Sequence, residues 1–288
     1  MRFHVDRYLK DMCLRARQNW RLKQAQRSSP EAAAAYSEVH SYLEERSHTL
    51  DVVTKKNILY VPIQKNATSL IRRSLSELGD MRSYSIYGNR VAKYGNPATF
   101  DEVPIEDFYR VLTSPDAFRF TLTRNPYDRL VSAWASKFDG VPLVPSKRFS
   151  RGNPSIDTYL KWRQASDSSL PEGAGQSLSF EQFADYAMAV CEQWEDPHIQ
   201  TQSSMIDVPL LELNFIGKFE SLNQDITRLL DFSNASDELR DRVLVPVNPT
   251  APKDLTDYYK NGLTEKVYQA YEQDFDRFQY SSDLGQLA

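Results

Sequence analysis

The sequence contains little cysteine, and it has no long apolar run. Two of its 288 residues are cysteine, Cys13 and Cys191, so a disulfide framework is not expected and a reducing compartment is the simpler prediction. No apolar run approaches the roughly 18 residues that a membrane-spanning helix needs. The first ten residues also lack the apolar stretch of a secretory signal peptide. These absences predict a soluble protein of the cytoplasm.

A large excess of positive charge is missing as well, because the formal net charge is −4 at pH 7. Nucleic acid is therefore not an expected partner. Residues 1–27 carry eight Lys or Arg against two Asp, whereas the remainder carries 27 Lys or Arg against 37 Asp or Glu. An anion-binding site in this acidic remainder must be built from a few local cations and backbone amides.

Short β-rich runs alternate with stretches of helical periodicity along most of the chain. Strands are predicted at 57–61, 118–123 and 213–219. Helices are predicted at 30–46, 69–78, 128–138, 155–165, 179–193, 222–230, 236–243 and 264–278. This order is typical of an α/β fold with three αβα layers, a mostly parallel central sheet and, here, extra N-terminal helices. We expect one domain over residues 51–288 and a helical extension over residues 1–50.

Two further segments need separate predictions. Residues 5–26 have the spacing of a basic amphipathic helix, which either packs on its own domain or contacts a membrane surface or a partner. Residues 139–179 are rich in Pro, Gly and Ser. Long excursions from compact domains are commonly lids or disordered segments, and here we expect a lid on the substrate side.

The loop after the first predicted strand, residues 62–69, has the features of an anion site. It enters a helix N-terminus, where backbone amides and the helix dipole favour a negative group. Lys65 adds a full positive charge, and Thr68 and Ser69 add hydroxyl donors. The loop is not the motif G-x-x-x-x-G-K-[ST] of nucleotide-triphosphate sites, because its lysine comes first and it has no glycine. Taken alone, it is equally compatible with an ordinary strand–helix turn.

A second polar motif follows the strand at 118–123. It reads Arg124-Asn-Pro-Tyr-Asp-Arg-Leu-Val-Ser132, and it again connects a strand to a helix. Arginine presents a planar fork that suits phosphate, and Ser132 lies two helical turns further on. Together with the loop at 65–69, this motif resembles the two signatures of sulfotransferases that use 3′-phosphoadenosine-5′-phosphosulfate (PAPS).

This resemblance covers about residues 57–280 and follows the carbohydrate-type branch of the family. Weaker matches to that branch lie at 196–202, 215–222 and 266–280. Two residues depart from the first signature, since Gln64 stands where the family often has proline and Ala67 where it has glycine. Alanine at this position needs either a negative φ or strain.

The resemblance implies a P-loop-like sulfotransferase fold, with PAPS as co-substrate, PAP (3′,5′-ADP) as product and no metal. It implies that Lys65 is catalytic and neutralises the bridging oxygen as it leaves. The 65–69 loop would hold the 5′-phosphate, and the second motif would hold the 3′-phosphate. The residues expected to bind the donor are Lys65, Asn66, Ala67, Thr68, Ser69, Arg124 and Ser132. Arg129, by contrast, is read as structural.

The acceptor hydroxyl also needs a general base. Of the four histidines, only His198 falls in a family-like segment, and histidine titrates near neutral pH. His198 is therefore the candidate base, and a structural histidine bonded to backbone is the alternative.

The sequence thus predicts an enzyme that transfers a sulfuryl group to a hydroxyl, with a carbohydrate such as a glycan or glycolipid as acceptor. A tyrosylprotein or small-metabolite sulfotransferase would use the same donor. A P-loop nucleotide kinase is less compatible, because the G-K-[ST] sequence is missing. A non-catalytic partner protein with the same fold is left open by the glycine-free loop.

Overall fold

The computed structural model describes residues 18–46, 48–79, 81–84, 103–143, 153–166, 177–243 and 254–286. In this part of the chain, strands form a five-stranded sheet in the order β3-β1-β2-β4-β5. The strands are β1 (Leu50–Val53), β2 (Ile58–Val61), β3 (Arg82–Tyr84), β4 (Phe118–Thr123) and β5 (Phe215–Lys218). β2, β4 and β5 are parallel neighbours, whereas β1 is antiparallel to β2 and β3. All these strands except β1 therefore run in one direction, which confirms the predicted mostly parallel sheet.

Helices connect and flank these strands. They are α2 (Pro30–Glu45), α3 (Thr68–Glu77), α4 (Ile105–Thr113), α5 (Pro126–Lys137), α6 (Pro154–Ser166), α7 (Phe180–Val190), α8 (Gln202–Ile206), α9 (Leu222–Phe232), α10 (Asp237–Val243) and α11 (Leu263–Phe278). Helix α5 begins where the sequence supplies both a proline for the first turn and an Asn125 side chain that accepts from the Tyr127 amide. A capping box of Ser179 and Gln182 starts α7.

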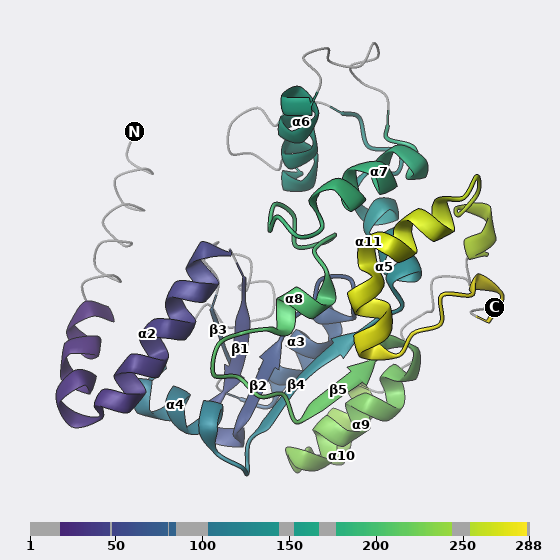
Figure 1. Ribbon diagram of the computed structural model, residues 1–288. Coiled ribbons are helices and arrows are strands. Elements are labelled where there is room, and N and C mark those ends of the chain that lie inside the picture. The colour runs from purple at the N-terminus through teal and green to yellow at the C-terminus, as the bar shows by residue number, and fades with distance from the viewer. Residues whose placement is uncertain are drawn as a thin grey trace.

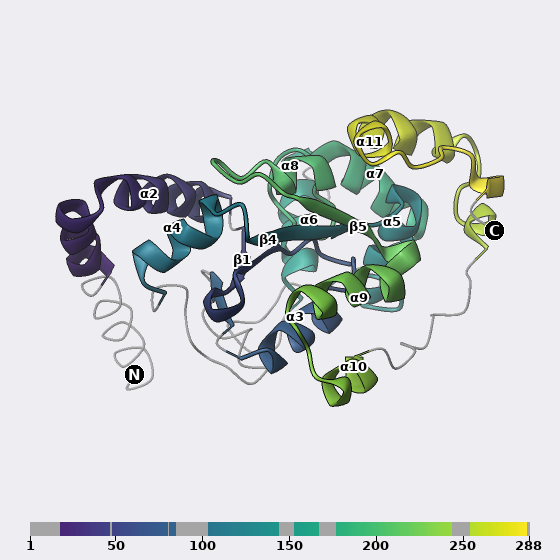
Figure 2. The same ribbon diagram turned by 90° about the horizontal axis from the view of Figure 1, so that it is seen from below.

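The sheet lies between two layers of helices, as Figure 2 shows. The side chains of β2 alternate between these layers, as the pleat of a strand requires. Leu59 and Val61 pack in a core with α2, α4 and α8. Ile58 and Tyr60 pack in a second core with α3, α9 and α10. The three-layer αβα architecture is therefore confirmed.

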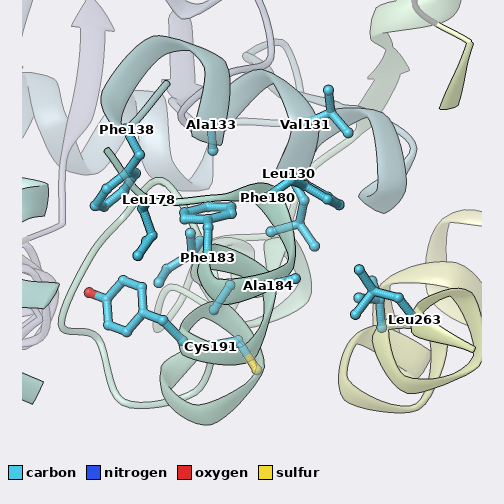
Figure 3. Close-up of a cluster of buried hydrophobic side chains, with 14 of the residues drawn as sticks. Leu130, Val131, Ala133, Phe138, Leu178, Phe180, Phe183, Ala184, Cys191 and Leu263 are labelled. Carbon is cyan, nitrogen blue, oxygen red and sulfur yellow. The ribbon is translucent and has the colours of Figure 1, made fainter. Parts of the chain in front are cut away.

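A third core lies beyond the sheet, where α5, α6, α7 and α11 gather (Figure 1). Figure 3 shows its aromatic centre, in which Phe138, Phe180 and Phe183 lie between α5 and α7. The free thiol of Cys191 is buried in the same core, and burial raises its pKa to about 12. This cluster fixes α5, which carries the second half of the second polar motif.

The N-terminal helices join the main core. Residues 18–28 are helical, and α2 packs against α4 and covers one face of the sheet. The rest of the predicted helix at 5–26 lies outside the described residues. Of the excursion at 139–179, α6 confirms the helix predicted at 155–165, whereas residues 144–152 and 167–176 also lie outside the described part.

Two strands and two α-helices of the described residues were not predicted from the sequence: β1, β3, α4 and α8. β1 carries Asp51 in its centre, which interrupts the apolar pattern, yet this carboxylate is buried against Arg72 of α3 at 2.7 Å. α8 spans only five residues, too few for a helical period to be seen. The other predicted helices and strands form within a few residues of their expected ends.

Candidate functional site

The two polar motifs meet at one edge of the sheet. Strands β2 and β4 are adjacent and parallel, with Val61 opposite Thr121, so the loops that follow them emerge side by side. The guanidinium Nη1 of Arg124 donates a hydrogen bond of 2.9 Å to the backbone carbonyl of Lys65. The residues that the sequence placed in two separate signatures therefore form one site.

The first loop turns sharply before α3 begins at Thr68. Lys65 and Ala67 both adopt left-handed backbone conformations, with φ of 76° and 56°. Alanine rarely adopts this conformation, so Ala67 is strained in the place where the family signature has glycine. An alternation of left- and right-handed residues at a helix start directs successive amides toward one point and forms an anion-binding concavity.

The hydroxyl groups of this loop have different environments. Thr68 is buried, and its hydroxyl donates to the Ile63 carbonyl at 2.6 Å, which closes the turn. The Ser69 side chain is exposed at the start of α3. The Thr68 hydroxyl proton and the Asn66 backbone amide, which donates to the Ile63 carbonyl at 3.3 Å, are thus used within the loop, whereas the Ser69 side chain is exposed.

Lys65 reaches from the first loop to helix α5. Its ammonium group donates to the hydroxyl of Ser136 at 2.7 Å. Ser132 lies one helical turn earlier on the same face of α5 and is half-buried. Its hydroxyl makes no hydrogen bond with any other described residue. A lysine and two serines thus line one side of the site.

The guanidinium of Arg124 is held by Asp128 and Phe219 as well as by the Lys65 carbonyl. Asp128 accepts from its Nε and Nη2 at 2.8 and 2.7 Å, and the Phe219 ring lies 4.0 Å below the guanidinium carbon. This carboxylate and ring fix the plane of the guanidinium. The guanidinium hydrogens not used by Asp128 and Lys65 have no partner among the described residues, so they can serve as donors to an anionic ligand.

A buried amide network joins both loops to α8. The Asn66 amide donates to the Leu122 carbonyl at 2.8 Å and to Oε1 of Gln202 at 2.7 Å. The same Oε1 accepts from the Arg124 amide at 2.9 Å, and Nε2 of Gln202 donates to the Arg124 carbonyl at 2.8 Å. The Asn66 side chain therefore points into the protein, where it holds the loop in place.

His198 lies in the turn before α8, paired with a buried carboxylate. Its Nδ1 is 2.7 Å from Oδ1 of Asp196, so the pair leaves Nε2 as the nitrogen that can accept a proton. Burial lowers the pKa of His198, Asp196 opposes this, and the charges of Lys137 and Lys65 lower it further. The charge of Lys65 therefore reaches the imidazole of His198, although the two side chains form no hydrogen bond with each other.

Arg129, the other arginine of the second motif, has a structural environment. It is fully buried and donates to the backbone carbonyls of Gln64, Gln200 and Pro197 at 3.1, 2.7 and 3.3 Å. It thereby ties the first loop to the segment that carries His198. This agrees with its interpretation as a structural residue.

Sequence reasoning assigned no role to five site residues: Asp128, Ser136, Asp196, Gln202 and Phe219. Three had a usable local signal, since Asp128 follows Arg124 by four residues, Ser136 follows Ser132 by four, and Asp196 precedes His198 by two. Gln202 and Phe219 contact Arg124 across 78 and 95 residues of sequence, and local spacing gives no signal for such contacts.

Cavities elsewhere contain none of these residues. One of about 290 Å³ lies between the helix at 18–28 and α2, and another of about 550 Å³ lies beside α2, α4 and residues 210–212. In the described ranges no group of three His, Cys, Asp or Glu side chains could hold a metal ion. Within the same ranges no helix has the length and apolar character to cross a bilayer.

Comparisons with known proteins match most of this chain. A family model described as "Sulfotransferase family" matches residues 48–281. Carbohydrate sulfotransferase 11 of Mus musculus is 25% identical over 235 residues, which cover 78% of this chain and 64% of the relative. Carbohydrate sulfotransferase 9 of Homo sapiens is 28% identical over 211 residues, which cover 71% of this chain and 46% of the relative. The chain thus spans less than two thirds of the length of these relatives, and no solved structure gives a significant match.

Proposed function

Because the chain belongs to the sulfotransferase family, we propose that it transfers a sulfuryl group from PAPS to a hydroxyl group of a carbohydrate. The single observation that carries this proposal is the hydrogen bond of 2.9 Å between Arg124 and the Lys65 carbonyl, which brings the two signature loops together. A donor with phosphates at both ends of one adenosine needs two such loops at one strand edge.

The residues present fit such a donor. The loop amides before α3, the exposed Ser69 hydroxyl and the Lys65 ammonium supply donors for one phosphate. Arg124 and the Ser132 hydroxyl, which has no partner among the described residues, supply donors for the other. Thr68 and Asn66 support these groups from beneath, since their side chains bond within the protein.

Sulfuryl transfer requires mainly that the donor and acceptor are correctly positioned and that the developing negative charge is stabilised. As the bond from sulfur to the acceptor oxygen forms, the bond from sulfur to the 5′-phosphate oxygen breaks. Lys65 neutralises the charge that builds on this leaving oxygen. His198 takes the acceptor proton on Nε2, while Asp196 holds the ring by Nδ1 and stabilises the imidazolium that forms. This scheme needs no metal ion.

A carbohydrate acceptor is proposed from the relatives, whose names describe carbohydrate sulfotransferases. A tyrosylprotein or small-metabolite acceptor would use the same donor site. The choice among them depends on which acceptor hydroxyl can approach His198.

Calorimetric titration with PAP tests the donor site, and transfer of labelled sulfate from PAPS to a panel of glycans tests the reaction. We expect PAP to bind and Arg124→Ala to weaken its binding by about 2–4 kcal/mol, as loss of one partner of a charged hydrogen-bonded pair does. Arg73→Ala is the matched control, since Arg73 is exposed on α3 and pairs with Glu77. Stabilisation by ATP with Mg²⁺ but not by PAP would instead support a nucleotide kinase.

A further inference from the structure

One buried side chain connects the donor loops to the segment that carries the candidate base. We propose that Gln202 is a positioning residue that fixes the separation between the donor-binding loops and His198. This inference rests on the proposed function, because it concerns the same site. It assigns to Gln202 a role in alignment, without contact to either substrate.

Where β4 ends, the Gln202 carboxamide provides the backbone hydrogen bonds that a neighbouring strand would otherwise provide. β4 stops at Thr123, so the Arg124 peptide has left the sheet. Gln202 then accepts from the Arg124 amide at 2.9 Å and donates to the Arg124 carbonyl at 2.8 Å. A single side chain thus satisfies both polar groups of the peptide that bears the phosphate-binding guanidinium.

The same carboxamide also holds the first loop in place. Its Oε1 accepts from the Asn66 side chain at 2.7 Å, next to Lys65. Asn66 and Gln202 are both fully buried, so no solvent can substitute for a lost partner. A shift of Gln202 would therefore move both donor loops together.

The backbone on the other side of Gln202 is equally fixed. The Asp274 carboxylate of α11 accepts from the amides of Gln202 and Ser203 at 2.8 and 2.7 Å. The Tyr271 hydroxyl, also on α11, donates to the Ile199 carbonyl at 2.6 Å. His198 therefore sits on a segment anchored to α11, and Gln202 transmits that position to both donor loops.

The choice of an amide at this position makes the proposal testable. Two donors and one acceptor face Gln202, and only a group with one oxygen acceptor and one hydrogen donor suits them. A protonated glutamic acid has the same pattern. An ionised glutamate has lost the hydrogen that the Arg124 carbonyl requires.

The test is Gln202→Glu, with PAP affinity and single-turnover rate measured from pH 5.5 to 9 and divided by the wild-type values at each pH. We expect a loss of about tenfold or more in PAP affinity where the introduced carboxyl is ionised, with recovery toward wild type as pH falls and it becomes protonated. Gln202→Met, which keeps the length but neither polar group, should show the loss at every pH.

Gln200→Glu is the matched control. Gln200 is also fully buried in the same segment, but its side chain bonds the Trp194 amide and Ser204 and does not touch the donor loops. For Gln200→Glu, the PAP affinity divided by that of wild type should not rise as the pH falls. If Gln202→Glu does not fold, Gln202→Met alone decides, by whether PAP affinity falls.

The outcomes separate the two proposals. Wild-type protein that fails to bind PAP would remove the proposed function. Wild-type binding together with unchanged PAP affinity in folded Gln202 variants, or the same pH-dependent recovery in Gln200→Glu, would overturn the positioning role and leave the donor site intact.

Discussion

Arg124 donates from Nη1 to the backbone carbonyl of Lys65 at 2.9 Å, although the two residues lie 59 positions apart in the sequence. The arginine proposed to hold one end of the donor therefore also holds the backbone of the lysine proposed to act at the other. Residues in one hydrogen-bonded network do not contribute independently. Substitutions at these two positions should be read as changes to one site.

Lys65→Ala should reduce turnover by about two to four orders of magnitude, as loss of one positioned electrostatic group commonly does. The side chain is only partly buried, so folding should be nearly unaffected. Single-turnover transfer from PAPS measures the effect. Lys55→Ala is the control, because Lys55 is exposed before β2, at the end of that strand remote from the site. A normal rate in Lys65→Ala would exclude this lysine from the chemistry.

The pH dependence of turnover should report His198. A base must be neutral to accept a proton, so turnover should rise with pH, and since burial lowers the pKa of His198, the rise should be centred below about 6.5. Lys137→Met removes a cation that lowers this pKa further, so its midpoint should move to higher pH. Lys161→Met, on the exposed face of α6, should not move it.

The variant His198→Gln provides the complementary test. It should lose the rising limb together with most of its turnover, while PAP affinity stays close to wild type. Two outcomes would contradict the base assignment: an unchanged midpoint in Lys137→Met, or a rate that still rises with pH in His198→Gln. Either would support the alternative that His198 is a structural histidine.

The sequence predicted those parts of the fold that local periodicity specifies. Residues 118–123 alternate as a half-buried strand and form β4 with these bounds. The missed elements are stabilised by tertiary contacts, as with β1, whose central Asp51 is buried only because Arg72 reaches it. The division at residue 50 and the cytoplasmic location stay predictions.

At the site, the sequence indicated which residues belong to each loop, but it did not indicate which side chains connect the two loops. The order of Lys65 and Arg124 relative to their strands indicated one strand edge, since parallel strands end together. The bridge made by Gln202 crosses 136 residues to Asn66 and 78 to Arg124, and such pairings leave no local pattern. Without the structure, Gln202 was part of a family-like segment with no assigned contact.

Ala67→Gly should stabilise the protein. Ala67 has φ of 56° and ψ of 21°, a left-handed conformation that costs alanine roughly 1–2 kcal/mol. Glycine removes this strain but gains freedom in the unfolded chain, so a net gain of about 0.5–1 kcal/mol in the free energy of unfolding is expected. Ala34→Gly, in the exposed interior of α2, should instead cost about 1 kcal/mol. Urea unfolding compares the two, and a loss for Ala67→Gly would contradict the strain.

Acid should destabilise the folded protein through His48, which has no role in the proposed chemistry. His48 is buried against Trp194, with ring centroids 5.5 Å apart, and its Nε2 has no hydrogen-bond partner among the described residues. Burial lowers its pKa from 6.5 to about 4. The unfolded state therefore binds a proton first as pH falls, so the stabilisation is complete above about 6.5 and is lost between there and about 4.

The size of this effect follows from the shift, at 1.36 kcal/mol per pKa unit, and amounts to about 3 kcal/mol at the acid limit. His48→Leu cannot titrate, so the slope of its unfolding free energy against pH between 7 and 4.5 should be shallower than that of wild type, whatever its absolute stability. Subtracting the two curves removes the contribution of other titrating groups, since these remain in both proteins. Parallel curves would mean that His48 is protonated as readily in the folded protein as in the unfolded chain, which its complete burial beside Trp194 argues against.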